Sequence, residues 1–180
     1  MDSKYDVIIL AGPSGCGKTA LESMLIEQYP DKFNKLQQIS TRKMRDDESQ
    51  GNPYIFVTDD EYDEYEGSLI GKTEIHGDRY GTIFRPVKGK YNTIILDKGG
   101  IDSFRSIYPD FSQVNYIIVM VDSRKLKVRE GRDMQYVENE RWNIREVMNL
   151  CIVHNPPDYK GIEEMKNRIV EFFERYHRNK

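Results

Sequence analysis

The sequence predicts a three-layer α/β fold with a parallel central sheet. Three apolar runs lack strict alternation, as strands covered on both faces do: Val7 to Leu10, Thr93 to Leu96, and Tyr116 to Val121. Helical stretches lie between and after these runs, and a glycine-rich phosphate-binding pattern follows the first one. Strands that alternate with helices in this order build a parallel sheet with helices on both faces.

The first run leads into this phosphate-binding loop. Residues 12–19 read Gly-Pro-Ser-Gly-Cys-Gly-Lys-Thr and fit G-x-x-x-x-G-K-[ST] at every fixed position, with a helix expected over Thr19 to Gln28. Glycines let backbone N–H groups point at phosphate oxygens, and the helix N-terminus adds its dipole. Lys18 would supply a cation to the β- and γ-phosphates, and the Thr19 hydroxyl would bind Mg²⁺. The alternative is a glycine-rich turn with an accidental lysine.

The cysteine of the loop has two interpretations. The helix N-terminus could activate the Cys16 thiol, or Cys16 only fills a variable position. The expected ATP-binding residues of the loop are Gly12, Ser14, Gly15, Cys16, Gly17, Lys18 and Thr19.

Residues 40–85 interrupt the alternation of strands and helices. Gly51-Asn52-Pro53 is a turn before a short strand expected at Tyr54 to Val57, and Thr58 to Glu61 resembles a capping box that opens a short helix. Further short strands are expected after it, separated by three glycines: Gly71, Gly77 and Gly81. We interpret the region as an inserted lobe that holds a second substrate.

The second apolar run is followed directly by Asp97. A carboxylate at the carboxyl end of a parallel strand faces the nucleotide crevice, where it can hold Mg²⁺ through water. The alternative is a cap for the helix expected over Ile101 to Tyr108.

The third run is followed by a charged segment, residues 122–145, which overlaps a helix expected around Glu138 to Met148. Its arginines are Arg124, Arg129, Arg132, Arg141 and Arg145. We interpret the segment as a mobile arginine lid over the phosphates, and the alternative is a solvated helix face. Beyond it, a final helix is expected to begin at Asp158 or Gly161. Its apolar stripe predicts core packing: Ile162, Met165, Ile169, Phe172 and Tyr176.

Length and composition predict a single domain, and setting the inserted lobe aside leaves residues 1–39 and 86–180 as its core. The 180 residues are 38% hydrophobic and 32% charged, with a net charge of −3 and a pI of about 5.7, so no basic field favours nucleic acid as a partner. No apolar run approaches membrane-spanning length, the N-terminus lacks a signal-peptide pattern, and two cysteines make no disulfide framework. We therefore expect a cytoplasmic protein, a monomer or homodimer, that binds small-molecule nucleotides and no membrane.

Polar groups in the inserted lobe are suited to a second phosphate. Arg42 and Arg45 are three residues apart and can converge on one phosphate with forked hydrogen bonds, and the hydroxyls of Tyr54 and Tyr80 can donate without adding charge. Taken alone, such arginines are usually surface charge and such tyrosines are usually packing residues.

Together these residues make the chain resemble a guanylate kinase, a nucleoside monophosphate kinase of the P-loop class, from Val7 to about Asn155. The matching segments are Gly12 to Thr19, Ser40-Thr41-Arg42 with Arg45, Glu48 with Gly51 and Tyr54, Phe56-Val57, His76 to Thr82, and Leu96-Asp97. The resemblance implies a P-loop kinase fold with an inserted lobe that binds the monophosphate and a short arginine-rich lid.

The resemblance also implies roles for single residues. The positions on the monophosphate side are Gln38, Arg42, Arg45, Tyr54, Gly71, Tyr80 and Thr82. Lys18, Thr19 and Asp97 would serve ATP and Mg²⁺. Arg129 or Arg132, together with Arg141, would close over the transferring phosphoryl group, and Asn155 matches an asparagine on the adenine side.

Three positions depart from the family where it recognises guanine. The glutamate of the family segment Gly-x-Phe-Leu-Glu falls at Gly71, a serine falls at Gln38, and an aspartate falls at Gly99. Losing a hydrogen bond to a charged partner costs about 1.5–3 kcal/mol, so we expect weaker discrimination for guanine. Gly71 would leave room for a bulkier base, unless a bulge brings Glu74 into the pocket instead.

The leading hypothesis is an ATP- and Mg²⁺-dependent kinase of a nucleoside or deoxynucleoside monophosphate. The alternatives are a sugar-phosphate kinase of the same fold and a non-catalytic guanylate-kinase-like interaction module. The complete phosphate loop argues against the second, because a scaffold has no need of Lys18 and Thr19. A GTPase is disfavoured because no Asn/Thr-Lys-x-Asp motif is present.

Overall fold

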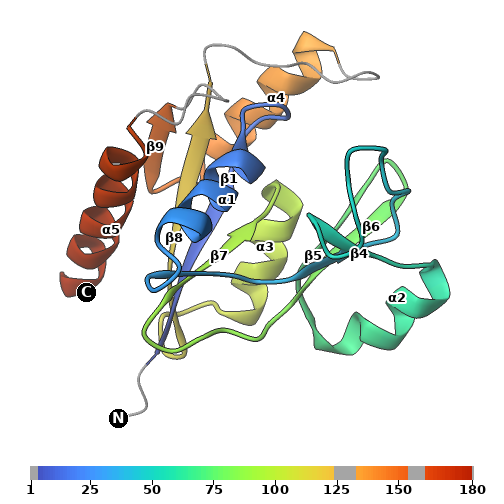
Figure 1. Cartoon of the computed structure of the whole chain (residues 1–180), viewed down its shortest axis with the longest axis horizontal. Helices are drawn as coiled ribbons and strands as arrows, with labels where there is room; N and C mark the ends of the chain where they lie inside the picture. Colours follow the sequence, from blue (N-terminus) through green and yellow to red (C-terminus); the bar gives the residue numbers. More distant parts are fainter. Residues whose placement is uncertain (1–3, 124–132, 154–160, 180) are drawn as a thin grey trace.

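A computed structural model of the protein describes residues 4–123, 133–153 and 161–179, and its larger sheet is parallel throughout (Figure 1). The strand order is β2-β7-β1-β8-β9, and each neighbouring pair is parallel. The strands are β1 (Tyr5–Ala11), β2 (Phe33–Lys35), β7 (Tyr91–Ile95), β8 (Val114–Asp122) and β9 (Leu150–Val153). The predicted α/β class is confirmed. Sequence analysis did not identify the short strands β2 and β9.

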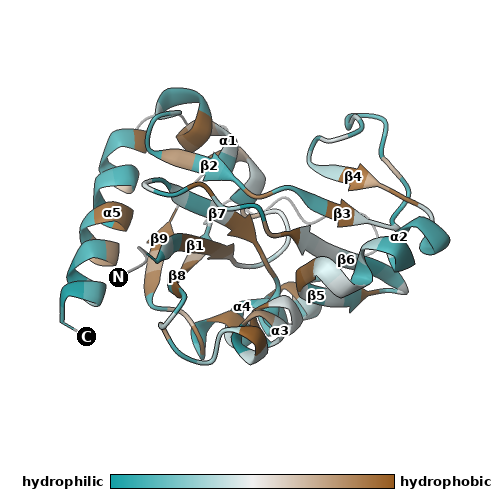
Figure 2. Ribbon diagram, turned by 90° about the horizontal axis from the view of Figure 1, so that it is seen from below, coloured by the Kyte–Doolittle hydropathy of each residue, from teal (hydrophilic) through white to brown (hydrophobic). Residues whose placement is uncertain are grey.

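Helices cover both faces of this sheet and complete the three layers. Alternate residues of β1 divide between two buried clusters. Val7 and Ile9 belong to the cluster that includes α3 (Lys98–Ile107) and α4 (Met134–Arg145), whereas Ile8 belongs to the one with α1 (Lys18–Gln28) and α5 (Ile162–Arg178). Figure 2 shows the apolar strands enclosed between helices whose outer surfaces are polar.

A second, four-stranded sheet stands beside the core and forms the lobe (Figure 1). Its order is β4-β3-β6-β5, and it has a small buried cluster of its own, made of Ile39, Tyr62 and Leu69. The strands are β3 (Gln38–Ser40), β4 (Tyr54–Phe56), β5 (Leu69–Ile75) and β6 (Asp78–Ile83). The predicted capping box is present, because Thr58 and Glu61 exchange hydrogen bonds at the start of α2 (Asp59–Tyr65), which leads into the 3-10 turn η1 (Glu66–Ser68). The lobe sheet begins at Gln38, two residues before the boundary we expected.

The helix starts differ from prediction where side chains cap them. Asp97 caps α3, which therefore begins at Lys98 and not at Ile101. Asp133 caps α4 by accepting a hydrogen bond from the Tyr136 N–H, so this helix begins four residues before Glu138 and ends before Met148. Capping side chains satisfy N–H groups that the first turn leaves without partners.

The last helix packs on the core as predicted. It begins directly after Gly161, whereas Asp158 lies outside the described residues. The buried side chains of its inner face join the α1 side of the core: Ile162, Ile169 and Phe173. Among the residues that the structure describes, no helix is long and apolar enough to cross a membrane.

Candidate active site

The phosphate loop connects the carboxyl end of β1 to the start of α1. A Cβ at Gly12, where φ is +143°, would lie 2.1 Å from the carbonyl oxygen of Val121, so only glycine lets the loop pass this closely over the end of β8. Gly17 precedes α1 and no side chain caps that helix. The first N–H groups of α1 are therefore directed at the space where a ligand would sit.

Two side chains occupy the loop. Lys18 Nζ donates to the carbonyl oxygens of Gly12 and Pro13, at 2.7 and 3.0 Å. The backbone N–H of Ser14 donates to Glu140 Oε2 at 2.8 Å, although Glu140 belongs to α4. Burial raises the pKa of the Cys16 thiol, which belongs to the core cluster beside α1. Cys16 is therefore a packing residue and not an activated thiolate.

Asp97 lies at the carboxyl end of β7, as predicted, and also caps α3. Its Oδ1 accepts a hydrogen bond from the Gly100 N–H at 2.8 Å, and its Oδ2 accepts one from the Thr73 hydroxyl at 3.1 Å. The alternative interpretation as a helix cap therefore describes part of what this carboxylate does. Its position also brings it to the cavity beside the phosphate loop.

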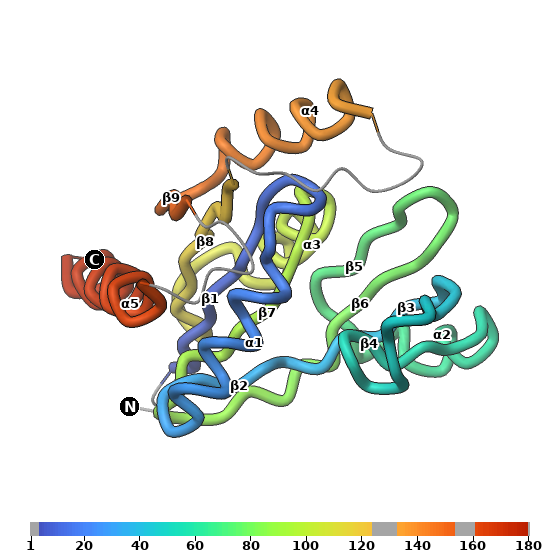
Figure 3. The backbone as a smooth tube through the Cα atoms, turned by 45° about the horizontal axis from the view of Figure 1, so that its top comes forward, coloured from blue at the N-terminus to red at the C-terminus, as the bar shows by residue number. Residues whose placement is uncertain are grey.

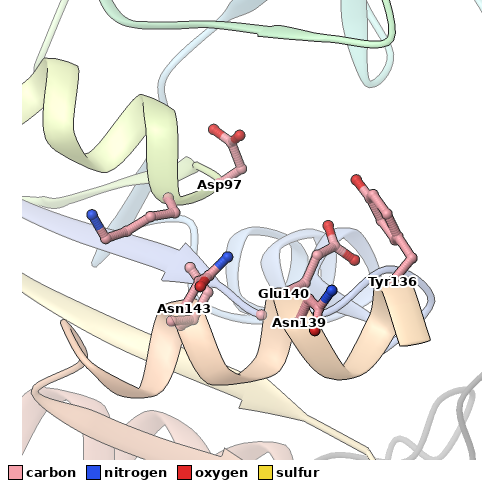
Figure 4. A pocket seen from close by; sticks show the side chains of 8 residues that line it. Asp97, Tyr136, Asn139, Glu140 and Asn143 are labelled. Carbon is pink, nitrogen blue, oxygen red and sulfur yellow. The ribbon is translucent and has the colours of Figure 1, made fainter. Parts of the chain in front are cut away.

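This cavity, of about 280 Å³, separates the phosphate loop and the start of α3 from one face of α4 (Figure 4). From the core side it is lined by Gly12, Asp97 and Lys98. From α4 it is lined by Tyr136, Asn139, Glu140, Asn143 and Ile144, spaced three or four residues apart as one helix face requires. Thr19 is exposed in the first turn of α1. Hydroxyl and carboxylate oxygens are ligands that Mg²⁺ accepts, so Thr19 and Asp97 fit the expected metal by chemical type.

The structure brings the two lobe arginines together around Glu48. Arg42 donates two hydrogen bonds to the Glu48 carboxylate, at 2.8 and 2.9 Å, and the Arg45 guanidinium lies 3.5 Å from the same group. Burial works to raise the pKa of Glu48, but the hydrogen bonds from Arg42 and from the Arg45 N–H hold the pKa below its usual range. Glu48 thus fixes both guanidinium groups in one place.

Two tyrosines complete this cluster. The Tyr54 and Tyr80 rings have centroids 5.7 Å apart, and the Arg42 guanidinium lies 5.4 Å from the centroid of the Tyr54 ring. Burial raises the pKa of both tyrosines, so their hydroxyls stay protonated and can donate to an anion. The four side chains that we predicted from separate segments of the sequence lie together on β4, β6 and the loop after β3.

Gln38 and Thr82 face each other across β3 and β6. Gln38 is buried, and its amide nitrogen donates to the Ile95 carbonyl oxygen at 2.9 Å and lies 3.3 Å from Thr82 Oγ1. The Gln38 amide thus links the lobe to the end of β7. Its two N–H groups are engaged within the protein, which leaves the carbonyl oxygen as the group it can offer a ligand.

Gly71 lies in a β-bulge. Residues 71 and 72 of β5 together face the single residue Gly81 of β6, and Gly71 has a φ of +59°. With this backbone, a Cβ at Gly71 would lie 2.8 Å from Leu96 Cδ2, so the expected room for a bulkier base is already filled by Leu96.

The bulge does not bring Glu74 to the site. Glu74 is exposed and faces Arg79 across the two strands. Thr73 occupies the inner position instead, where its hydroxyl donates to Asp97. A Cβ at Gly99 would lie 2.7 Å from Thr73 Oγ1, so Thr73 fills the space beside this third departure from the family pattern.

Of the predicted lid arginines, Arg141 and Arg145 are described. Arg141 lies on α4, and its guanidinium bonds to Asp122 at the end of β8, at 3.0 Å, and to Glu138. Arg145, the last residue of α4, lies 3.9 Å from the Asp122 carboxylate. The other predicted residues of this group lie outside the described residues: Arg124, Arg129, Arg132 and Asn155.

Sequence analysis named Glu48 only as a match to the family, and it missed two other residues that the structure brings to the site, Thr73 and Glu140. Glu48 is six residues after Arg42 and three after Arg45, a spacing that could have predicted its ion pairs. Thr73 and Glu140 carry no local signal, because their positions depend on the bulge and on the packing of α4.

Comparisons of the sequence with known proteins show one family, and a solved structure shares its fold. The sequence model of guanylate kinase matches residues 4–149. The chain is 32% identical to the guanylate kinase of Helicobacter hepaticus over 146 residues, which covers 76% of this chain and 72% of that protein. It is 32% identical over 172 residues to the guanylate kinase of Lactobacillus delbrueckii subsp. bulgaricus, which covers 91% of this chain and 83% of that protein. The crystal structure of guanylate kinase from Anaplasma phagocytophilum superposes with a TM-score of 0.65 at 22% identity, covering 98% of this chain and 88% of that one.

Proposed function

The chain belongs to the guanylate kinase family, and we propose that it transfers the γ-phosphate of ATP to a nucleoside or deoxynucleoside monophosphate. The observation that carries this proposal is the pairing of a complete phosphate loop in the core with a cluster of two arginines and two tyrosines in the lobe. One site is suited to a triphosphate and the other to a monophosphate, as phosphoryl transfer between nucleotides requires.

The lobe, residues 40–85, would bind the acceptor. Within the described residues, the hydrogen bonds of Arg42 to Glu48 and to the Lys43 carbonyl oxygen engage three of its five N–H groups, which leaves two donors for a phosphate. The hydroxyls of Tyr54 and Tyr80 add neutral donors to the same place. Thr82 and Gln38, on the neighbouring strands, would line the side on which the nucleoside lies.

The core would bind ATP through the phosphate loop. The N–H groups of the loop and of α1 would receive the phosphates, and Lys18 would leave its carbonyl partners in the loop to reach the β- and γ-phosphates. Thr19 and Asp97 would hold Mg²⁺, which would supply neutralising charge when bound. We assign residues 122–145 the role of a lid, in which Arg141 would exchange Asp122 for the transferring phosphoryl group, with Arg129 or Arg132 beside it and Asn155 near the adenine.

The mechanism relies on positioning and charge neutralisation. An oxygen of the acceptor phosphate attacks the γ-phosphorus of ATP, the bond from that phosphorus to the bridging oxygen breaks, and ADP leaves with the bond's electrons. No strong general base is needed, because the acceptor oxygen is already anionic. Lys18 and the lid arginines stabilise the charge spread over the equatorial oxygens.

We propose that discrimination for guanine is weaker than the family pattern implies. Guanine presents two adjacent donors, N1–H and N2–H₂, and the departures at Gly71 and Gly99 remove carboxylates that would accept from them. What remains is the carbonyl oxygen of Gln38 with the Thr82 hydroxyl beside it, and the Thr73 hydroxyl beside Asp97. Such a set suits a base edge that mixes one donor with acceptors, as thymine and uracil do.

A panel of monophosphates tests both levels of this proposal. Each base is supplied as the ribo- and deoxyribonucleotide with ATP and Mg²⁺, beside a sugar phosphate, and diphosphate formation is measured. Turnover of at least one nucleotide supports the kinase, whereas turnover of the sugar phosphate alone would favour the other acceptor class. If GMP or dGMP exceeds every other acceptor by about 100-fold in kcat/KM, equivalent to about 2.7 kcal/mol, the proposed base preference is wrong.

A further inference from the structure

The phosphate loop holds a carboxylate that comes from the chain itself. Glu140 Oε2 accepts the backbone N–H of Ser14 at 2.8 Å, in the loop that we propose binds the phosphates of ATP. Gly12 and Glu140 line the same cavity from opposite sides, so the side chain of Glu140 bridges from α4 to the loop (Figure 4).

A carboxylate at this position resembles a phosphate oxygen in charge and in what it accepts. Anionic oxygens bind backbone N–H groups of such loops because the loop dipoles favour negative charge. Within the described part of the chain, Glu140 forms no ion pair. The Glu140 carboxylate accepts a hydrogen bond from the Ser14 N–H, so the dipoles of the loop stabilise its negative charge.

Neighbouring contacts hold α4 in the position that Glu140 needs. One turn earlier on the helix, the Tyr136 ring lies against His76 at the tip of the β5–β6 hairpin, with centroids 5.7 Å apart. Figure 3 shows this hairpin of the lobe reaching toward α4. The next residue, Arg141, is held by Asp122 at the end of β8. The contact of Glu140 thus belongs to an arrangement that joins α4, the lobe and the core.

We propose that Glu140 is an internal competitor of the donor's phosphates. Its carboxylate has to leave the Ser14 N–H before a phosphate oxygen can accept that hydrogen, and the two anions repel each other while both are near the loop. ATP binding is therefore coupled to a displacement of Glu140, and Glu140 lowers the affinity for ATP. This inference rests on the proposed function of the loop.

The test compares the wild-type protein with Glu140→Gln and Glu140→Ala. Isothermal titration calorimetry measures the Kd of ATP and, separately, of pyrophosphate, which has phosphate groups but no nucleoside. Glu146→Gln is the matched control, because Glu146 follows the last turn of the same helix and caps it through backbone contacts, away from the loop. Glutamine keeps the shape and one acceptor, so this variant remains informative if alanine disturbs α4.

We expect both ligands to bind Glu140→Ala at least tenfold more tightly than wild type, about 1.4 kcal/mol, with Glu140→Gln in between and Glu146→Gln unchanged. Equal Kd values for the wild type and both Glu140 variants would overturn the inference and leave the proposed function intact. A gain in Glu146→Gln as large as in Glu140→Gln would also overturn it, because the effect would then be net charge alone. Binding of neither ligand to any variant would refute the proposed function, and the inference with it.

Discussion

Replacing Arg42 with lysine tests how the lobe recognises the acceptor. The Arg42 guanidinium makes forked hydrogen bonds to Glu48 at 2.8 and 2.9 Å and lies 5.1 Å from the centroid of the Phe56 ring. Lysine keeps the charge but loses this fork, the ring contact and the two remaining donors that we assign to phosphate. A hydrogen bond to a charged group contributes about 1.5–3 kcal/mol, so kcat/KM for the monophosphate should fall about 10- to 150-fold.

The assay is a steady-state measurement of diphosphate formation. The monophosphate is varied at saturating ATP, and ATP is then varied at saturating monophosphate. The KM for ATP should change much less than the acceptor parameters. Arg178→Lys is the control, because Arg178 pairs with Glu174 on the exposed end of α5. A loss confined to the KM for ATP would mean that the two sites are assigned the wrong way round, and a change below about threefold in every parameter would refute acceptor binding by Arg42.

Three further predictions address the loop, the lobe and the lid. Gly12→Ala directs a Cβ at the Val121 carbonyl oxygen, 2.1 Å away, so the free energy of unfolding in urea should fall by about 2 kcal/mol or more. Gly89 also has a positive φ, but no atom lies within 4 Å of a Cβ added there, so Gly89→Ala should lower the free energy of unfolding by less. The pKa of Glu48 is lowered in the folded protein, so the ionised carboxylate stabilises the fold above its unfolded pKa of about 4.3. This stabilisation is lost as the pH falls through the lowered pKa. When the free energy of unfolding is measured at a series of acidic pH values, it should therefore fall less steeply for Glu48→Gln than for the wild type. Amide hydrogen exchange in α4 should slow when a two-substrate mimic binds, and equal protection with and without the mimic would count against a lid.

The core of the fold could be predicted because its signals are local. The apolar runs around Val7, Thr93 and Tyr116 are long enough to identify buried strands, and the glycine-rich loop fixes where the first helix begins. The strands β2 and β9 are three and four residues long, and their pairing with β7 and β8 depends on contacts distant in the sequence. Such short segments carry no periodicity of their own.

The site residues could be predicted where a sequence motif determines their positions. They could not be predicted where their positions depend on tertiary packing. The resemblance to the family predicted phosphate binding by Arg42, Arg45, Tyr54 and Tyr80, and the structure places all four together. The residues expected to contact the base could not be predicted in the same way, because a bulge at Gly71 decides which side chains of β5 face inward. One added residue in a strand reverses the facing of those that follow, so no spacing rule distinguishes the two outcomes.

The partner of Ser14 shows the same limit. Residues 14 and 140 are far apart in the sequence, and neither the loop motif nor the charge pattern of residues 122–145 indicates that a carboxylate of α4 reaches the loop. The caps of α3 and α4 lie between these cases. Asp97 and Asp133 are common capping residues directly before the helices; sequence analysis gives the cap as the alternative role of Asp97 and does not identify Asp133.

The central claim is that Lys18 and its loop transfer a phosphoryl group from ATP to a monophosphate. Transfer of labelled γ-phosphate from ATP to each monophosphate, measured for the wild-type protein and for Lys18→Ala, tests it most directly. The variant's melting temperature shows whether its fold is retained, as expected because the hydrogen bonds of Lys18 Nζ stay within the phosphate loop, to the Gly12 and Pro13 carbonyl oxygens and to Cys16 Sγ. We predict labelled diphosphate with the wild type and none above background with Lys18→Ala. Near-normal transfer by the variant, or no transfer by the wild type to any monophosphate, would contradict the claim.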